Sequence, residues 1–349
     1  MQGRFNDRPC DEQAGNQGGL SQRVNDGMDA VAERLSVDSL TVVGSGLNRP
    51  ECVIASRAGE LFTPDWTVGI AHIAADGAVS AAVEAPLIAD GFLPNGIALM
   101  PDGSFLFANL GVQGGIWRVG KQGPAEPFLT AVGDYKVPPA NFVMTDGDRI
   151  WVTVSAATRG HAHFSGDEKT GTIILIEGGS ARIVADSLTW TNELRISPDR
   201  QHLYVNETFA CRTTRFRLGA DGSLSEKTSI EFPPGTFPDG MAFDAEGCLW
   251  IVCPVSNRII RMQPDLSWTV VFEDCDPAFF AEMSATYAAG KLTRDMIVNS
   301  RGSRLSNLSS IAFGGPDMRT VFLGSLTMPS IACLRSPVAG APMDHWGHA

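Results

Sequence analysis

The chain has 349 residues, and this length allows either two domains or one large all-β domain. Hydrophobic residues make up 44% of it, which is typical of a globular protein and excludes a largely disordered one. The formal net charge of −12 argues against nucleic acids and anionic membranes as partners, because both attract basic surfaces.

The amino-terminal region is polar and lacks the apolar stretch of a signal peptide, so we expect a cytoplasmic protein. No apolar run approaches the length of about 18–20 residues that a membrane-spanning helix requires. We interpret residues 1–37 as a tail, with a candidate short helix at Met28–Leu35, and residues 337–349 as a second tail. The folded domain is expected at residues 38–336.

A short sequence phrase recurs six times along this domain. Each copy has a polar residue, an apolar strand, a turn rich in Pro, Asp or Gly, and a second strand that ends in an aromatic residue. An apolar third strand and a weaker fourth strand follow, so the repeats predict an all-β, six-bladed β-propeller with four-stranded blades. The copies are Asn48–Phe62, Leu93–Phe107, Pro139–Trp151, Trp190–Tyr204, Phe237–Trp250 and Leu308–Phe322.

Two segments lie outside the repeated phrase. A propeller ring is normally closed by a strand from the other end of the chain, and we expect Ser39–Leu47 to supply the outer strand of the last blade. A helical insertion is predicted between blades five and six, because Phe279, Met283 and Tyr287 have the spacing of one helix face. Two interpretations stay open: this helix covers the mouth of the propeller, or it packs on the edge of a blade.

The polar residue that precedes the first strand of each blade is a candidate ligand. First strands line the central channel of a propeller, so residues at this repeat position converge on one axis. Side chains that offer only oxygen suit a hard cation such as Ca²⁺ or Mg²⁺, and two carboxylates would neutralise its charge. Water bound in the channel is the alternative explanation. The five residues are Glu51, Asn95, Asn141, Asn192 and Asp239.

Five motifs within the repeats resemble a known family. They are RPE at Arg49–Glu51, PNGIALMPDG at Pro94–Gly103, TNELRISPD at Thr191–Asp199, FPDGMAFDAEGCLWIV at Phe237–Val252 and SIAFGGPDMRTVFLGSL at Ser310–Leu326. Over residues 38–335 the chain resembles the SMP-30/gluconolactonase/luciferin-regenerating-enzyme-like family, which is related to the diisopropylfluorophosphatase-type calcium propellers. The resemblance implies one divalent cation, with Ca²⁺ expected and Mg²⁺, Mn²⁺ or Zn²⁺ as alternatives. The ligands that it implies are Glu51, Asn141, Asn192 and Asp239.

The chain departs from the family's sugar lactonases at three positions. Those enzymes usually carry a basic residue where this chain has Pro139, an Asp where it has Phe142 and a Gly where it has Glu193. The loss of the basic residue and of the Asp argues against a gluconate-type lactone, and the aromatic residues near the site predict a more apolar or aromatic substrate. The residues that we expect to contact the substrate are Asn95, Phe142, Phe164, Trp190, Phe237, Phe279 and Phe280.

The resemblance implies a metal-dependent lactone hydrolase, an enzyme of the carboxylic-ester hydrolase type with a small-molecule lactone as its partner. The cation would polarise the carbonyl, and water activated by Asp239 would attack it. His161 and His163, in a long loop at the same end of the propeller, are further candidate catalytic residues. Two other functions stay open: hydrolysis of phosphotriesters or aryl esters, and ligand binding by a non-catalytic propeller with a structural cation. We expect a monomer or a weak homodimer.

Overall fold

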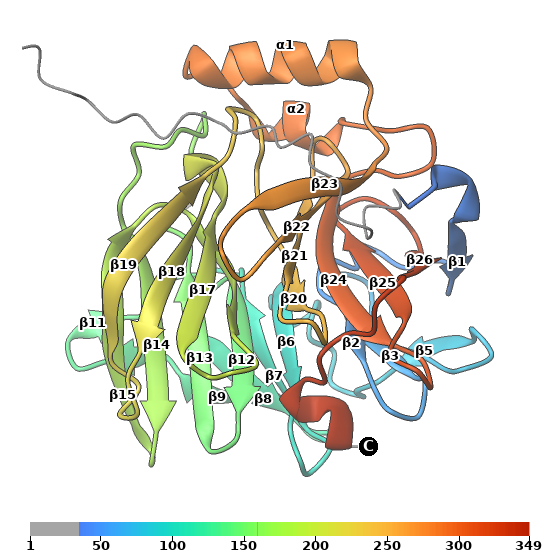
Figure 1. Ribbon diagram of the computed structural model, residues 1–349. Helices are drawn as coiled ribbons and strands as arrows, with labels where there is room; N and C mark the ends of the chain where they lie inside the picture. The colour runs from blue at the N-terminus through green and yellow to red at the C-terminus, as the bar shows by residue number, and fades with distance from the viewer. Residues whose placement is uncertain (1–34, 159, 349) are drawn as a thin grey trace, which may run out of the picture. The chain divides into compact units, whose positions relative to one another are not determined.

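The computed structural model describes residues 35–158 and 160–348, and this part of the chain is mostly β-structure (Figure 1). Six antiparallel sheets of four strands each follow one another along the chain in a propeller arrangement. The predicted six-bladed β-propeller with four-stranded blades is therefore confirmed. The candidate helix at Met28–Leu35 lies, but for its last residue, outside the described part of the chain.

Within each blade the strands follow chain order, apart from the last strand of blade six. Blades one to three consist of β2 (Ile54–Ala55), β3 (Leu61–Asp65), β4 (Gly69–Ile73) and β5 (Val79–Ala81); β6 (Pro94–Leu99), β7 (Phe105–Asn109), β8 (Ile116–Val119) and β9 (Glu126–Leu129); and β12 (Phe142–Asp146), β13 (Arg149–Val154), β14 (Gly171–Glu177) and β15 (Ser180–Leu188). Blades four to six consist of β16 (Thr191–Ile196), β17 (His202–Glu207), β18 (Arg212–Leu218) and β19 (Leu224–Glu231); β20 (Met241–Phe243), β21 (Leu249–Cys253), β22 (Arg258–Met262) and β23 (Trp268–Glu273); and β24 (Leu308–Gly314), β25 (Thr320–Ser325), β26 (Ile331–Arg335) and β1 (Thr41–Val43). Smaller elements are the hairpin of β10 (Ala131–Val132) and β11 (Tyr135–Lys136) and the 3₁₀ helices η1 (Val37–Ser39) and η2 (Thr208–Ala210).

Blade six is completed by a strand from the start of the folded region. β1 pairs antiparallel with β26, so that Thr41 lies opposite Cys333 and Val43 opposite Ile331. The prediction that Ser39–Leu47 closes the ring is therefore confirmed. Since the first and last parts of the domain share one sheet, their backbone hydrogen bonds hold the ring closed.

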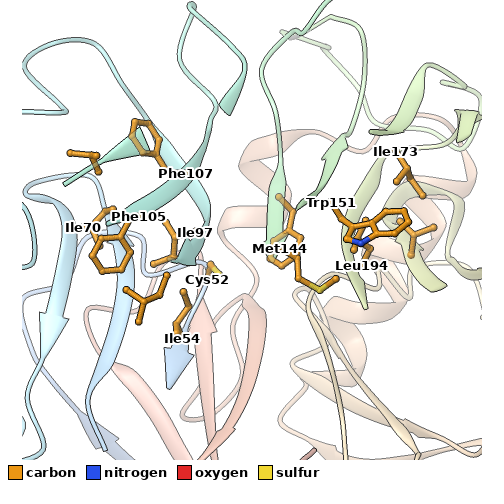
Figure 2. Packing of buried hydrophobic residues seen from close by; sticks show 14 of the residues in the cluster. Cys52, Ile54, Ile70, Ile97, Phe105, Phe107, Met144, Trp151, Ile173 and Leu194 are labelled. Carbon is orange, nitrogen blue, oxygen red and sulfur yellow. The ribbon is translucent and has the colours of Figure 1, made fainter. Parts of the chain in front are cut away.

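Apolar side chains fill the spaces between neighbouring blades (Figure 2). Trp151 of β13 is fully buried and belongs to the same cluster as Leu194 of the next blade. On the other side, Ile54 of blade one belongs to this cluster together with Ile97 and Phe105 of blade two. Burial of one large apolar side chain contributes about 1.5–3 kcal/mol. The stacking of blades therefore stabilises the ring, because one blade cannot bury both its faces alone.

Two α-helices lie between blades five and six at one end of the propeller (Figure 1). α1 (Pro277–Ala288) begins after Asp276, whose carboxylate accepts hydrogen bonds from the backbone N–H groups of Ala278 and Phe279. α2 (Arg294–Val298) follows after a short loop. The predicted helical insertion is confirmed. No helix in the described part of the chain is long and apolar enough to cross a bilayer.

The carboxyl-terminal segment covers the opposite end of the channel and ends in the short 3₁₀ helix η3 (Asp344–Gly347) (Figure 1). The Ala341 N–H donates a hydrogen bond to the Phe243 carbonyl oxygen over 2.9 Å. His345 is buried and lines a narrow space that Arg195 also lines. This segment therefore restricts access to the channel from the end that faces away from α1 and α2.

Candidate active site

A cavity of about 840 Å³ lies at the helical end of the propeller. Residues of all six blades and of α2 line it. The repeated sequence phrase places one polar side chain in this cavity from each of five blades. These side chains are the ones that the sequence singles out: Glu51, Asn95, Asn141, Asn192 and Asp239.

These residues reach the cavity because each lies at or just before the start of an innermost strand. Strand pairing is irregular at two of them, since the register shifts in β6 and β16 occur around Asn95 and Asn192. Such bulges change the direction of a side chain and are common beside active sites. Gly240 follows Asp239 and allows the first strands of blades five and six to approach closely. A Cβ atom at Gly240 would lie only 2.5 Å from the Ser309 carbonyl oxygen.

Three side-chain oxygens in the cavity are buried and have no hydrogen-bond partner within the described structure. They are the Oδ1 atoms of Asn141, Asn192 and Asp239. The Nδ2 of Asn192 donates to Thr208 Oγ1 over 3.1 Å, and this hydroxyl donates to the Pro238 carbonyl over 2.8 Å. Thr208 therefore fixes the orientation of the Asn192 amide. A buried acceptor without a partner costs about 1–3 kcal/mol, so this group of oxygens fits a bound cation.

The two carboxylates of the cavity also fit a cation. Burial raises the pKa of Asp239 well above its ordinary value, and the charges of Glu51 and Glu193 raise it further. Burial likewise raises the pKa of Glu51, although the neighbouring Arg49 charge opposes this effect. Two buried carboxylates are unfavourable in their charged forms unless a positive charge lies between them. A divalent cation would supply that charge.

Arg49 connects the ligand candidates of the first two blades. Its Nη1 donates to Glu51 Oε2 over 2.9 Å and to Asn95 Oδ1 over 2.8 Å. The guanidinium lies 4.4 Å from the centre of the Trp66 ring. The Nδ2 of Asn95 donates in turn to the Asn141 carbonyl oxygen over 2.9 Å. Both ends of the Asn95 amide thus bind protein groups, so its Oδ1 is not among the oxygens without a partner.

Aromatic side chains form the wall of the cavity on the side of blades three to five. Phe164 stacks on Phe209 with ring centres 4.4 Å apart, and Trp190 lies edge-on to both rings. Phe237 lies edge-on to Phe209 at 5.5 Å. The ring of His161 lies 4.8 Å from that of Trp190. A substrate in this cavity would therefore contact an apolar, aromatic surface on this side.

Four of the predicted residues lie outside the lining of the cavity. Phe142 begins β12 directly after Asn141, and its ring lies in the channel, 4.8 Å from the Arg195 guanidinium. Successive residues of a strand point to opposite sides, which explains why Asn141 lines the cavity and Phe142 does not. Phe280 of α1 packs against Arg258 of β22. The other two residues outside the lining are Phe279 and the exposed His163.

Among the cavity residues that the sequence did not single out, Arg49, Phe209 and Arg294 bear most on its chemistry. Arg49 precedes Glu51 in the RPE motif, and its position two residues from a ligand was the available signal. Phe209 lies in η2, a loop element after the second strand of blade four, on the side where the repeat predicts the site. Arg294 lies at the start of α2, and no sequence pattern indicates that it faces the cavity.

The channel beneath the cavity holds a buried ion pair. Glu193 stands where the family's sugar lactonases usually have Gly, and its Oε2 accepts a hydrogen bond from Arg195 Nη2 over 2.8 Å. The Met241 N–H donates to the same oxygen over 3.3 Å. Burial raises the pKa of Glu193, and the Arg195 charge opposes this effect. The pair therefore adds a carboxylate near Asp239 together with its own counter-charge.

The fold and the cavity define a six-bladed propeller with an oxygen-lined site at one end of its channel. The sequence pattern described as the SMP-30/Gluconolactonase/LRE-like region matches residues 94–271. The chain belongs to this family. Its membership confirms the resemblance that the motifs indicate.

Two of the similar proteins are named as lactonases. The chain is 27% identical over 148 residues to a 6-deoxy-6-sulfogluconolactonase of Pseudomonas putida. That match covers 42% of this chain and 41% of the relative, so it spans less than half of either protein. Among solved structures, a gluconolactonase from Xanthomonas campestris superposes with a TM-score of 0.64 at 19% identity, covering 89% of this chain and 94% of the other. A calcium-binding regucalcin from Agrobacterium tumefaciens superposes with a TM-score of 0.54 at 16% identity, covering 89% and 96%. These structural likenesses show a shared fold.

Proposed function

We propose that this protein is a cation-dependent hydrolase that opens the ring of a small lactone with an apolar or aromatic body. One observation carries the proposal: two amide oxygens and one oxygen of Asp239 are buried without a partner among the described residues, and they line the same cavity as the buried carboxylate of Glu51. The family and its lactonase relatives support the reaction class. The aromatic wall supports the character of the substrate.

Four residues would hold one divalent cation, and Ca²⁺ is the ion that their oxygen-only donors favour. When bound, such a cation supplies positive charge that polarises the carbonyl group of a lactone. The name of the calcium-binding regucalcin, which shares the fold, supports a cation at this place. The proposed ligands are Glu51, Asn141, Asn192 and Asp239.

Asp239 is the proposed base. One oxygen of its carboxylate would face the cation, and the other would accept a hydrogen bond and then a proton from the attacking water. The water oxygen forms a bond to the lactone carbonyl carbon, and the ring C–O bond breaks. The proton then passes from Asp239 to the leaving ring oxygen, which yields a hydroxy acid. His161 lines the same cavity and is the alternative base.

The aromatic wall would orient the lactone. Trp190 Nε1 donates to the Ser165 carbonyl oxygen over 3.1 Å, which fixes the indole ring against the cavity. Phe164, Phe209 and Phe237 add apolar surface beside it. Contact with these rings would exclude water from the apolar body of the substrate. The carbonyl group of the lactone would then face the polar ligand residues of the cavity.

The first test is proton release from sugar, aliphatic and aromatic lactones before and after chelation with EDTA, with Ca²⁺, Mn²⁺ or Zn²⁺ restored afterwards. We expect turnover of aromatic lactones that disappears with EDTA and returns with the cation. Turnover that persists after verified removal of the cation would contradict the proposal.

Asp239→Asn tests the proposed base separately. We expect kcat to fall by about 10²–10⁴, because a general base contributes about that factor. Asp186→Asn is the matched control, because Asp186 is an exposed carboxylate on β15 that lies outside the lining of the cavity. An Asp239→Asn variant as active as the Asp186→Asn variant would exclude Asp239 and favour His161.

A further inference from the structure

Two arginines line the cavity. Arg49 precedes the first strand of blade one, and Arg294 begins α2. Arg49 uses only Nη1 for its bonds to Glu51 and Asn95. Its Nε and Nη2 groups form no hydrogen bond with a described residue. Arg294 forms no ion pair within 4.0 Å of a described carboxylate.

Arg49 is held in place by more than its ion pair. Its φ angle is 60°, a left-handed backbone conformation that is uncommon for a residue with a side chain. The Trp66 ring lies against its guanidinium, and Trp66 is fixed by a hydrogen bond from its Nε1 to the Pro94 carbonyl over 2.9 Å. Strained backbone of this kind persists where the surrounding structure enforces it, often at ligand sites. These contacts therefore hold the Nε and Nη2 groups of Arg49 in a fixed position before a ligand binds.

The arginines leave the cavity with positive charge once a cation is bound. Glu51 and Asp239 are the carboxylates among the described residues of the lining, and a divalent cation cancels their two charges. The charges of Arg49 and Arg294 then remain. Burial lowers the pKa of Arg294 and the Arg49 charge lowers it further, while the charges of Glu51 and Asp295 oppose this effect. An anion bound by Arg49 and Arg294 would offset their repulsion.

We infer that Arg49 and Arg294 bind an anionic group of the substrate, so that the lactone opened here carries a carboxylate, sulfonate or phosphate at one end. Guanidinium groups bind such groups through paired, charge-assisted hydrogen bonds. The aromatic wall of Phe164, Trp190 and Phe237 receives the apolar body. The inference rests on the proposed function, because the charge balance assumes a bound cation and the reaction assumes a lactone.

A pair of lactones of matched shape tests the inference by kinetics. The probes are a dihydrocoumarin that bears a carboxylate on its benzo ring and the methyl ester of the same compound. With Ca²⁺-loaded protein we expect kcat/KM to be at least about tenfold higher for the carboxylate, a preference of about 1.4 kcal/mol. Equal values for the two lactones would overturn the inference and leave the lactonase proposal intact.

The Arg294→Gln variant tests whether Arg294 causes the preference for the carboxylate lactone over its methyl ester. Arg294 is preferred over Arg49 for substitution, because Arg49 contacts a proposed ligand. We expect Arg294→Gln to remove most of the preference through a higher KM for the carboxylate, and Arg294→Lys to retain part of it. Lys291→Gln removes a positive charge from the same insertion outside the cavity lining and should behave as wild type. A preference that survives in Arg294→Gln would overturn the inference.

A binding measurement makes the result independent of catalysis. Calorimetric titration of Ca²⁺-loaded protein with 3-phenylpropionate and with the neutral 3-phenylpropanamide compares two ligands that no hydrolase step consumes. We expect the carboxylate to bind about tenfold more tightly, and Arg294→Gln to abolish this difference. A carboxylate that binds the cation directly would keep its advantage in Arg294→Gln, and that result would overturn the inference. Failure of lactone turnover with Arg294-dependent binding would overturn only the proposed function.

Discussion

At the scale of single residues, the site depends on how amide groups are oriented. An Asn side chain can present either its oxygen or its NH₂ group to a neighbour. For Asn192 the choice is made by Thr208, whose hydroxyl oxygen accepts the Nδ2–H and leaves Oδ1 without a partner. The Asn192 amide therefore presents its oxygen, the atom that can bind a cation, to the cavity. Asn95 shows the contrast, since Arg49 binds its oxygen.

Thr208→Val should therefore weaken cation binding. The substitution keeps the shape of the side chain and removes the acceptor that fixes Asn192. Loss of a group that orients a metal ligand typically costs about 10–100-fold in affinity, and we expect the Kd for Ca²⁺ to rise by this factor. Calorimetric titration of EDTA-treated protein with Ca²⁺ measures it. Thr269→Val, at an exposed position of β23, is the control, and equal affinities of the two variants would refute the argument.

The position of each residue relative to the repeat explains which site residues the sequence could predict. Glu51, Asn141 and Asp239 share one position of a repeat, and a repeat fixes both the place of a residue and its direction toward the channel. Phe142 follows its ligand by one residue, and strand alternation turns its ring away from the cavity. Arg294 lies outside the repeats, so its direction depends on how the insertion folds, which no local pattern records.

At the scale of elements, α1 and the aromatic wall form one unit. Met283 is fully buried in a cluster that includes Phe237, Cys211 and Leu292. The predicted helix face is thus the face that packs, because its spacing reflects burial directly. The sequence left open whether this helix covers the mouth of the propeller or the edge of a blade. In the structure α2, rather than α1, contributes side chains to the cavity lining.

Tyr287→Phe tests the link between α1 and the wall. The Tyr287 hydroxyl donates to the Phe209 carbonyl oxygen over 2.5 Å, and its ring lies 5.1 Å from that of Phe237. We expect the free energy of unfolding to fall by about 1 kcal/mol, the usual net contribution of one hydrogen bond. We also expect KM for an aromatic lactone to rise several-fold, because Phe209 loses its anchor. Chemical denaturation and steady-state kinetics measure the two effects.

Tyr135→Phe is the matched control for that prediction. Tyr135 lies on β11, and its buried hydroxyl has no partner within the described structure. Removal of an unsatisfied hydroxyl should leave stability unchanged or raise it, with no effect on KM. If Tyr287→Phe matches this control in both measurements, the hydrogen bond does not connect α1 to the site.

At the scale of the whole molecule, the two ends of the channel differ. The helical end holds the cavity, and the carboxyl-terminal segment covers the other end with His345 buried inside. The repeats predicted six blades and the closing strand, because blade formation follows local alternation and turn residues. They could not predict this cover. Residues 337–348 have no repeat partner, and their packing depends on contacts with several blades at once.

The buried His345 should make the stability of the molecule depend on pH. Burial, with the Arg195 and His348 charges, lowers the pKa of His345 from 6.5 to about 4. The unfolded chain therefore binds a proton at pH values where the folded protein keeps the ring neutral. The free energy of unfolding should fall as pH drops from 6.5 to 4, by up to about 3 kcal/mol from this group.

His345→Gln separates this contribution from the general effect of acid. Gln has no charge at any pH, so the variant should lose stability less steeply between pH 6.5 and 4 than the wild type does. Urea denaturation at half-unit pH steps measures both slopes, and His163→Gln serves as the control because His163 is exposed. If both His345→Gln and His163→Gln keep the wild-type dependence of the free energy of unfolding on pH, the His345 ring is protonated equally in the folded and unfolded states. The carboxyl-terminal segment would then leave His345 open to water, and the channel would not be closed at this end.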